Sequence, residues 1–191
     1  MFNCEGNKPT VEYSYDEAVR DGILVTYEAH ILETEVLSLG IEGKNLDSFL
    51  KDEIRRQEEE PDKLVLTGKE FGRVFMDNKT NELIVREFMS RCYRSDDNLP
   101  CKTIFFCVNQ KHANNIKEIF DRLYPNMSKH VQVITSDEYR AQDEVKRFKK
   151  NSEPRIALSV GMLDTGVDVP EVMNLVFVKP VFSHQRFWQM I

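Results

Sequence analysis

The C-terminal half of the chain alternates short apolar runs with stretches in which apolar residues recur at helical spacing. The run at 103–108 is almost continuously apolar, as a strand buried on both faces requires. Apolar residues at 111–123 recur three and four positions apart, which is typical of an amphipathic helix. Three further apolar runs lie at 131–134, 155–160 and 174–178. Strands that alternate with helices form right-handed βαβ units, so the pattern predicts an α/β domain with a mainly parallel sheet flanked by helices.

Capping residues indicate where three helices begin. Ser14 is followed three positions later by Glu17, a capping box that predicts a short helix ending at 21–22. Thr135 opens a second match to this box and predicts the helix that follows the second strand. Ser183 is expected to cap a last helix, which reaches the end of the chain.

The first hundred residues have a less regular pattern. β-Branched and alternating residues at 23–36 predict one or two strands. A charged helix is expected at 45–60, where Pro61 ends it, and a second helix at 80–93. This second helix is expected to turn four apolar residues inward, namely Leu83, Ile84, Phe88 and Met89. The first hundred residues are therefore predicted to be mixed and mostly helical.

A polar stretch at 95–100 ends in proline and predicts a turn between two parts of the chain. We expect three parts: an N-terminal segment at 1–30, an acidic and largely helical segment at 31–100, and the α/β domain at 101–191. Residues 1–100 carry 13 basic and 22 acidic groups, whereas 101–191 carries 13 basic and 10 acidic groups. Because the local field acts on a phosphate backbone, the net charge of −6 does not exclude a nucleic-acid partner.

The composition excludes several classes of protein. A hydrophobic content of 41% supports a packed core. No run of about 18 apolar residues occurs, and the N-terminus lacks the pattern of a signal peptide, so we expect a cytoplasmic protein with no membrane partner. The four cysteines match no metal-binding spacing and are expected to be reduced. His112 and His184 are expected to be capping or surface residues, so no metal site is predicted.

The segment at 157–170 carries the most informative residues. A buried strand runs directly into a loop that holds Thr165, Gly166 and Asp168. Glycine lets a ligand approach the backbone closely, a threonine hydroxyl suits a phosphate, and an aspartate suits a ribose hydroxyl or a cation. Ligands of parallel sheets bind beyond the carboxyl ends of the strands, which is where this loop lies. The residues alone favour a plainer interpretation, a βα connection in which Asp168 caps a turn and Gly166 relieves backbone strain.

Three motifs resemble those of superfamily 2 helicases and follow the order of that family. The sequence Thr-Gly-Val-Asp-Val-Pro at 165–170 resembles motif V, 103–113 resembles motif IV, and 179–191 resembles the approach to motif VI. The residues of these motifs, which include the pattern Met-Leu-x-Thr-Gly-x-Asp-x-Pro, are most similar to those in the restriction subunits of type I restriction enzymes. Residues 11–30 are similar to the stretch that joins the two motor lobes of those subunits. The resemblance therefore implies an inter-lobe connection at 1–30 and an insertion at 31–100.

The resemblance implies that 101–191 is the second RecA-like lobe, truncated before the end of motif VI, of an ATP-dependent DNA translocase and endonuclease. It implies that the DNA backbone is contacted by Asn109, Thr135 and Thr165. It also implies that one wall of the ATP cleft is formed by Gly166, Asp168 and Gln189. Contacts to the phosphate backbone carry no sequence information, so such a motor is expected to be insensitive to DNA sequence.

The chain also departs from the family pattern. Gly161 stands where relatives often carry an aspartate, and the Walker A loop and the Asp-Glu pair that holds magnesium are absent. The chain stops before the motif VI arginine that stabilises the transition state. The resemblance therefore implies ATP and Mg²⁺ bound mainly by the first lobe, no complete catalytic set, and no activity of this fragment alone. Its implied partners are double-stranded DNA, the first RecA-like lobe, and methyltransferase and specificity subunits.

Two alternatives stay open. The chain could be the motor lobe of another superfamily 2 helicase, one that repairs DNA or remodels RNA. It could also be a non-enzymatic binding module with a RecA-like fold, which predicts a chain that is complete at both ends.

Overall fold

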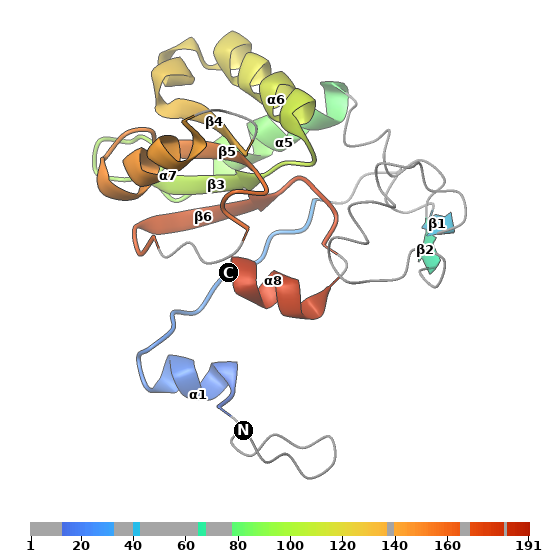
Figure 1. The fold of residues 1–191 in the computed structure, drawn as a ribbon, viewed down its shortest axis with the longest axis vertical. Helices are drawn as coiled ribbons and strands as arrows, with labels where there is room; N and C mark the ends of the chain where they lie inside the picture. The colour runs from blue at the N-terminus through green and yellow to red at the C-terminus, as the bar shows by residue number, and fades with distance from the viewer. Residues whose placement is uncertain are drawn as a thin grey trace. The chain divides into compact units, whose positions relative to one another are not determined.

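The structure is a computed structural model that describes residues 13–32, 40–42, 65–67, 78–136, 140–164, 169–181 and 183–191 (Figure 1). The chain divides into two compact units, Met1–Leu32 and Glu33–Ile191. Among the helices in the described ranges, none is both long enough and apolar enough to cross a bilayer. The helix expected at 45–60 lies outside the described residues.

The larger unit contains a four-stranded sheet in which all neighbours are parallel. Its strands are β3 (Lys102–Phe106), β4 (Val131–Thr135), β5 (Ile156–Val160) and β6 (Val172–Phe177), in the order β4-β5-β3-β6. β3 is buried along its whole length, as its apolar sequence requires. The predicted α/β class with a mainly parallel sheet is confirmed, and every predicted strand after residue 101 is observed within two residues of its expected position.

Alternate residues of β3 face two different apolar cores. Phe105 packs with residues of α5 (Asn78–Arg91) and α6 (Gln110–Leu123), which lie side by side above the strands in Figure 1. Phe106 belongs to the opposite core, together with Phe148 of α7 (Ala141–Lys150) and Met190 of α8 (His184–Met190). The period-two alternation of a strand thus produces a three-layer arrangement, with helices on both faces of the sheet.

The α5 helix is observed where a helix was predicted, but its buried face differs from the expected one. Leu83 was expected to point inward and is 41% exposed, whereas Asn81 and Val85 are fully buried. Phe88 is buried as expected. The face is rotated because Asn81 takes an inward position, where hydrogen bonds to α6 satisfy its amide.

A network of charged groups holds the amino edge of the sheet. The guanidinium of Arg155, which precedes β5, donates to Asp97 at 2.5 Å, to Ser95 at 2.6 Å and to Glu153 at 3.3 Å. His130, which precedes β4, lies 2.7 Å from the same Glu153 carboxylate. The turn predicted at 95–100 is present, and this network fixes it against the sheet.

Glu138, the partner residue of the capping box expected at Thr135, lies outside the described residues. Thr135 is the last residue of β4, and its hydroxyl has no hydrogen-bond partner among the residues that the structure describes. The α7 helix begins later, at Ala141, after the N-cap residue Arg140, whose side chain makes no capping hydrogen bond. The sequence pattern of a capping box fits here, but the strand continues through its first residue, so the threonine is held in the sheet.

The smaller unit contains α1 (Tyr15–Arg20), whose predicted capping box is present. The Ser14 hydroxyl accepts from the Glu17 N–H at 3.3 Å, and the Glu17 carboxylate accepts from the Ser14 N–H at 2.8 Å. The strands predicted from residue 23 onward do not occur in the described stretch up to residue 32. Val25 is 85% exposed and Ile31 is 86% exposed, so no neighbouring strand covers them. A two-stranded antiparallel pair, β1 (Gly40–Glu42) with β2 (Val65–Thr67), belongs to the other unit.

Candidate functional site

The carboxyl edge of the sheet brings the predicted site segments together. Because all four strands are parallel, Asn109 after β3, Thr135 at the end of β4, Gly161 after β5 and Lys179 after β6 lie along one edge. The predicted residues Thr165, Gly166 and Asp168 lie outside the described residues, although both ends of their loop start from this edge. The edge opposite to it is closed by the Arg155 network.

Asn109 caps α6. Its side-chain oxygen accepts from the His112 N–H at 2.8 Å, and its backbone is extended, as an N-cap requires. The side-chain nitrogen of Asn109 has no partner in the part of the chain that the structure describes, so it can donate to a ligand. The structure thus gives Asn109 a structural role in addition to its predicted one.

Thr135 is 1% exposed, and its hydroxyl is buried without a hydrogen-bond partner among the described residues. It pairs in the sheet with Val160, the last residue of β5. An unsatisfied buried hydroxyl costs about 1–3 kcal/mol, which a ligand or a neighbouring group can recover. Its position at the carboxyl edge is the predicted one, but its side chain lies beneath the surface.

The described part of the loop after β5 is tightly packed. Gly161 has a φ of +72°, a conformation that L side chains rarely adopt. The next turn is fixed by Ser159, whose hydroxyl accepts from the Leu163 N–H at 3.1 Å, and the Leu163 side chain is buried. The backbone therefore reverses at Gly161 and returns to the core, which places Asp164 inside the domain.

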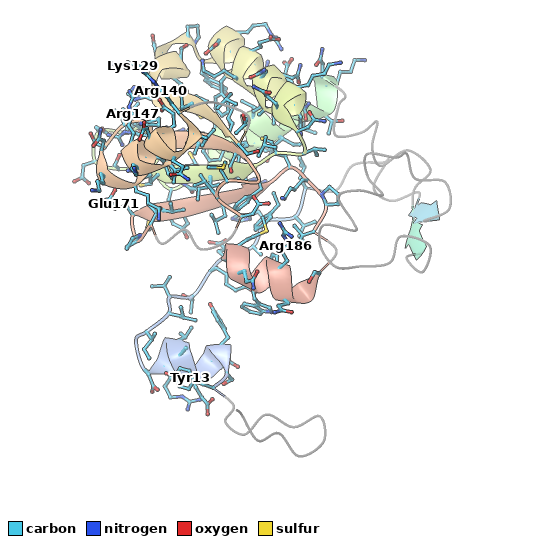
Figure 2. The ribbon with its side chains drawn as sticks, in the orientation of Figure 1. Tyr13, Lys129, Arg140, Arg147, Glu171 and Arg186 are labelled. Atoms are coloured by element: carbon cyan, nitrogen blue, oxygen red, sulfur yellow. The ribbon has the colours of Figure 1, made fainter. Side chains whose placement is uncertain are left out.

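Asp164 forms a buried cluster with two cations. It is 2% exposed and is paired with Lys179, which is 5% exposed. The Arg186 guanidinium lies 3.7 Å from the same oxygen of Asp164, and Figure 2 shows Arg186 on the side of α8 that faces the sheet. One carboxylate thus contacts groups from two other segments, the turn after β6 and the helix α8.

The α8 helix carries Gln189 and is anchored by its neighbours. The Ser183 hydroxyl accepts from the Arg186 N–H at 3.3 Å, which confirms the predicted cap. Phe187 packs on Phe177 of β6, with ring centroids 5.6 Å apart, and Met190 is buried. Gln189 is exposed, so its amide is accessible to a ligand.

Two ionisable core groups stay neutral beside this edge. Burial raises the pKa of the Cys107 thiol above its usual range, and the charge of nearby Lys179 acts weakly in the opposite direction. Burial lowers the pKa of His112 from 6.5 to about 4. His112 was expected at the surface or in a cap; it is fully buried, because its ring nitrogens bond to the Val108 N–H and to Asn81. In the described ranges, no group of three or more histidine, cysteine, aspartate or glutamate side chains is placed to hold a metal ion.

Sequence reasoning missed the Asp164 cluster. Asp164 stands in the variable position of the motif V pattern, and Lys179 and Arg186 follow it by 15 and 22 positions. One signal was present: a lysine directly after an apolar strand, at the same edge as a loop aspartate, is typical of a buried ion pair. The three residues come from separate segments, so only the sheet order places them in contact.

Two comparisons with known proteins found similar chains. The chain is 28% identical over 200 residues to the type I restriction enzyme EcoKI endonuclease subunit of Escherichia coli K12, an alignment that covers 96% of this chain. The chain spans 16% of that protein's length. The crystal structure of the Pyrococcus furiosus Hef helicase domain matches 65% of this chain and 22% of its own, with a TM-score of 0.41 and 20% identity. No family model matches. The predicted similarity to type I restriction subunits is therefore confirmed along almost the whole chain.

Proposed function

We propose that this chain is part of the second motor lobe of an ATP-driven double-stranded DNA translocase of the type I restriction kind. The observation that carries the proposal is the similarity to the EcoKI endonuclease subunit over 96% of the chain. The parallel sheet supports it, because the segments that resemble motifs IV, V and VI start from a single edge. Other domains of the full-length protein would supply the first lobe, the nuclease and the contacts to methyltransferase and specificity subunits.

In the proposed motor, ATP hydrolysis supplies the free energy for movement along DNA, and this chain binds and orients the DNA and the nucleotide. Thr165 and Asn109 hold DNA phosphates, Gly166 and Asp168 face the nucleotide, and Gln189 hydrogen-bonds to it. Two observations support these contacts: Gln189 is exposed, and the Asn109 side-chain nitrogen has no hydrogen-bond partner among the described residues. Magnesium would be held by acidic residues of the first lobe. The free energy of binding comes mainly from backbone phosphates, which makes the affinity for DNA depend on salt and not on sequence.

The experiment that tests the proposal measures the ATPase rate of the full-length protein with its partner subunits, with and without duplex DNA. We expect duplex DNA to stimulate the rate, and Thr165→Ala to abolish the stimulation. Gln189→Ala removes one hydrogen bond to the nucleotide and should raise the KM for ATP by about two- to tenfold.

A matched control is Gln142→Ala, which removes another exposed glutamine, from α7, and should leave both parameters unchanged. Stimulation by RNA but not by duplex DNA would assign the chain to an RNA-remodelling helicase. No response to either nucleic acid, with all partner subunits present, would contradict the motor proposal.

A further inference from the structure

Asp164 and Lys179 are buried charged residues at the carboxyl edge, and the Arg186 guanidinium lies beside them. Asp164 and Lys179 are both almost completely removed from solvent, and the side chain of Arg186 is 25% exposed. The second carboxylate oxygen of Asp164 is buried without a hydrogen-bond partner in the described ranges. A buried ion pair contributes little net stability compared with an apolar replacement, and its best-attested use is to fix one arrangement of segments.

The segments that this cluster joins are the ones assigned to the two ligands. Asp164 directly precedes Thr165 in the chain, the proposed phosphate contact. Arg186 and Gln189 are three positions apart on α8, so they lie on neighbouring positions of one helix face. A displacement of α8 would therefore move Gln189. Through the contact between Arg186 and Asp164, it would also displace the residue that precedes Thr165.

The α8 helix is short, and a small number of contacts hold it to the rest of the domain. It is a seven-residue helix, held by the Ser183 cap and by the contacts of Phe187 and Met190. Among the described residues, Asp164 is the acidic group that ties this helix to the loop after β5. Lys179, on the other side of the carboxylate, connects the same loop to the end of β6.

We propose that Asp164 is a positioning residue that couples the DNA-binding loop to the nucleotide-facing helix α8 by holding Lys179 and Arg186 together. This inference rests on the proposed function. It adds that the affinities for DNA and for ATP depend on each other through this carboxylate. By linkage, a nucleotide that changes the affinity for DNA must have its own affinity changed by DNA by the same factor.

The test measures this coupling factor in the full-length protein with its partner subunits. Duplex DNA affinity is determined by fluorescence anisotropy with and without a non-hydrolysable ATP analogue. We expect the analogue to change the Kd for DNA by at least about fivefold in the wild-type protein. The Asp164→Asn variant keeps the shape of the side chain but loses its charge, and its factor should fall to about one.

Two further variants separate coupling from stability. Arg186→Gln removes the cation on α8, which is partly exposed, and should fold even if Asp164→Asn does not; we expect its factor to fall in the same direction. Asp97→Asn breaks a more exposed ion pair, with Arg155 at the opposite edge, and should retain the wild-type factor. A purely structural role of Asp164 would lower the active fraction and leave both Kd values unchanged.

The outcomes distinguish the inference from the proposed function. If the wild-type protein shows coupling and both Asp164→Asn and Arg186→Gln keep it, the inference is overturned and the motor proposal stands. If Asp97→Asn loses the coupling as fully as Asp164→Asn, the effect is general destabilisation and the inference also fails. If the wild-type protein binds neither duplex DNA nor the analogue, the motor proposal itself is wrong.

Discussion

His112 shows how one buried side chain can set a pH limit on stability. The Val108 N–H donates to its Nδ1 at 3.3 Å, so this nitrogen carries no proton. Its Nε2 lies 3.1 Å from the Asn81 side-chain oxygen, which can only accept, so Nε2 carries the proton. Both ring nitrogens are satisfied in the neutral form, and burial lowers the pKa to about 4.

The stability of the chain should therefore decrease in acid. The unfolded chain binds a proton at His112 near pH 6.5, and the folded chain does so only near pH 4. Since the unfolded state binds more protons in this window, the free energy of unfolding should fall by about 3 kcal/mol between pH 6.5 and 4. Urea unfolding at several pH values measures it. His112→Gln should have a shallower dependence by that amount, and identical slopes in the two proteins would contradict the assignment.

Thr135 shows what residue patterns can and cannot predict. Its place at the carboxyl edge followed from the alternation of strands and helices, and the structure agrees. The helix expected to open at Thr135 begins instead at Ala141, because the same Thr-Ser-Asp-Glu sequence fits a helix start and the end of a strand. The Asp164 cluster was not predicted either, since contact between residues 15 and 22 positions apart depends on the order of the strands.

At the scale of elements, a chain of polar side chains joins α5 to α6. The Asn81 amide donates to the Asn115 oxygen at 3.0 Å, and the Asn115 amide donates to the Asn78 oxygen at 2.6 Å. Through His112 the same chain reaches the end of β3. Phe88 of α5 packs edge-on against Phe105 with ring centroids 4.9 Å apart, so polar and apolar contacts hold the same helix.

Removing the central member of this chain should weaken the attachment of α5. Asn81→Ala leaves the Nε2–H of His112 and the side-chain oxygen of Asn115 without their partner, and His112 is fully buried. We expect the free energy of unfolding to fall by about 1–3 kcal/mol, as measured by urea denaturation. Leu83→Ala on the exposed face of the same helix serves as the control, and it should cost under about 1 kcal/mol. Equal losses would mean that the polar chain is not what attaches α5.

Helices and strands could be predicted from the sequence where their burial requires a regular pattern of apolar residues. The strands and helices after residue 101 appear near their expected positions because both faces of the sheet are covered, which leaves a continuous apolar signal. Residues 23–32 have β-branched side chains but no strand, since β propensity needs a neighbouring strand to take effect. The buried face of α5 differs from the expected one because a hydrogen-bonded asparagine, Asn81, occupies a core position. The spacing of apolar residues cannot predict that a polar residue is buried.

At the scale of the whole molecule, the described end of the smaller unit is irregular and exposed. Residues 25–32 have no regular secondary structure, and the carboxylate of Glu28 is paired only with the exposed His30 in the described ranges. The larger unit holds its helices through two cores. The two units are therefore expected to differ in their resistance to local opening.

Limited proteolysis should detect this difference. A glutamate-specific protease should cleave after Glu28 at least about tenfold faster than after Glu118, which is exposed but lies within α6, because a helix must open before it enters a protease. Mass spectrometry of early fragments identifies the sites. Equally fast cleavage at the two positions would mean that α6 opens as readily as the end of the smaller unit.

The strand order has a consequence for synthesis on the ribosome. β3 is the first strand of the sheet to be made, yet its neighbours are β5 and β6, which follow more than fifty residues later in the pairs Thr103↔Ile156 and Thr103↔Asn174. Contacts so distant in sequence form slowly, because a long loop must close before they form. Until then, α5 and α6 are the segments available to cover the Phe105 face of β3, and the Phe106 face is covered only when α7 and α8 have been made. One face of a strand that is fully buried in the folded domain is thus uncovered until these later segments are made, which makes chaperone dependence and early aggregation an expected property of this arrangement.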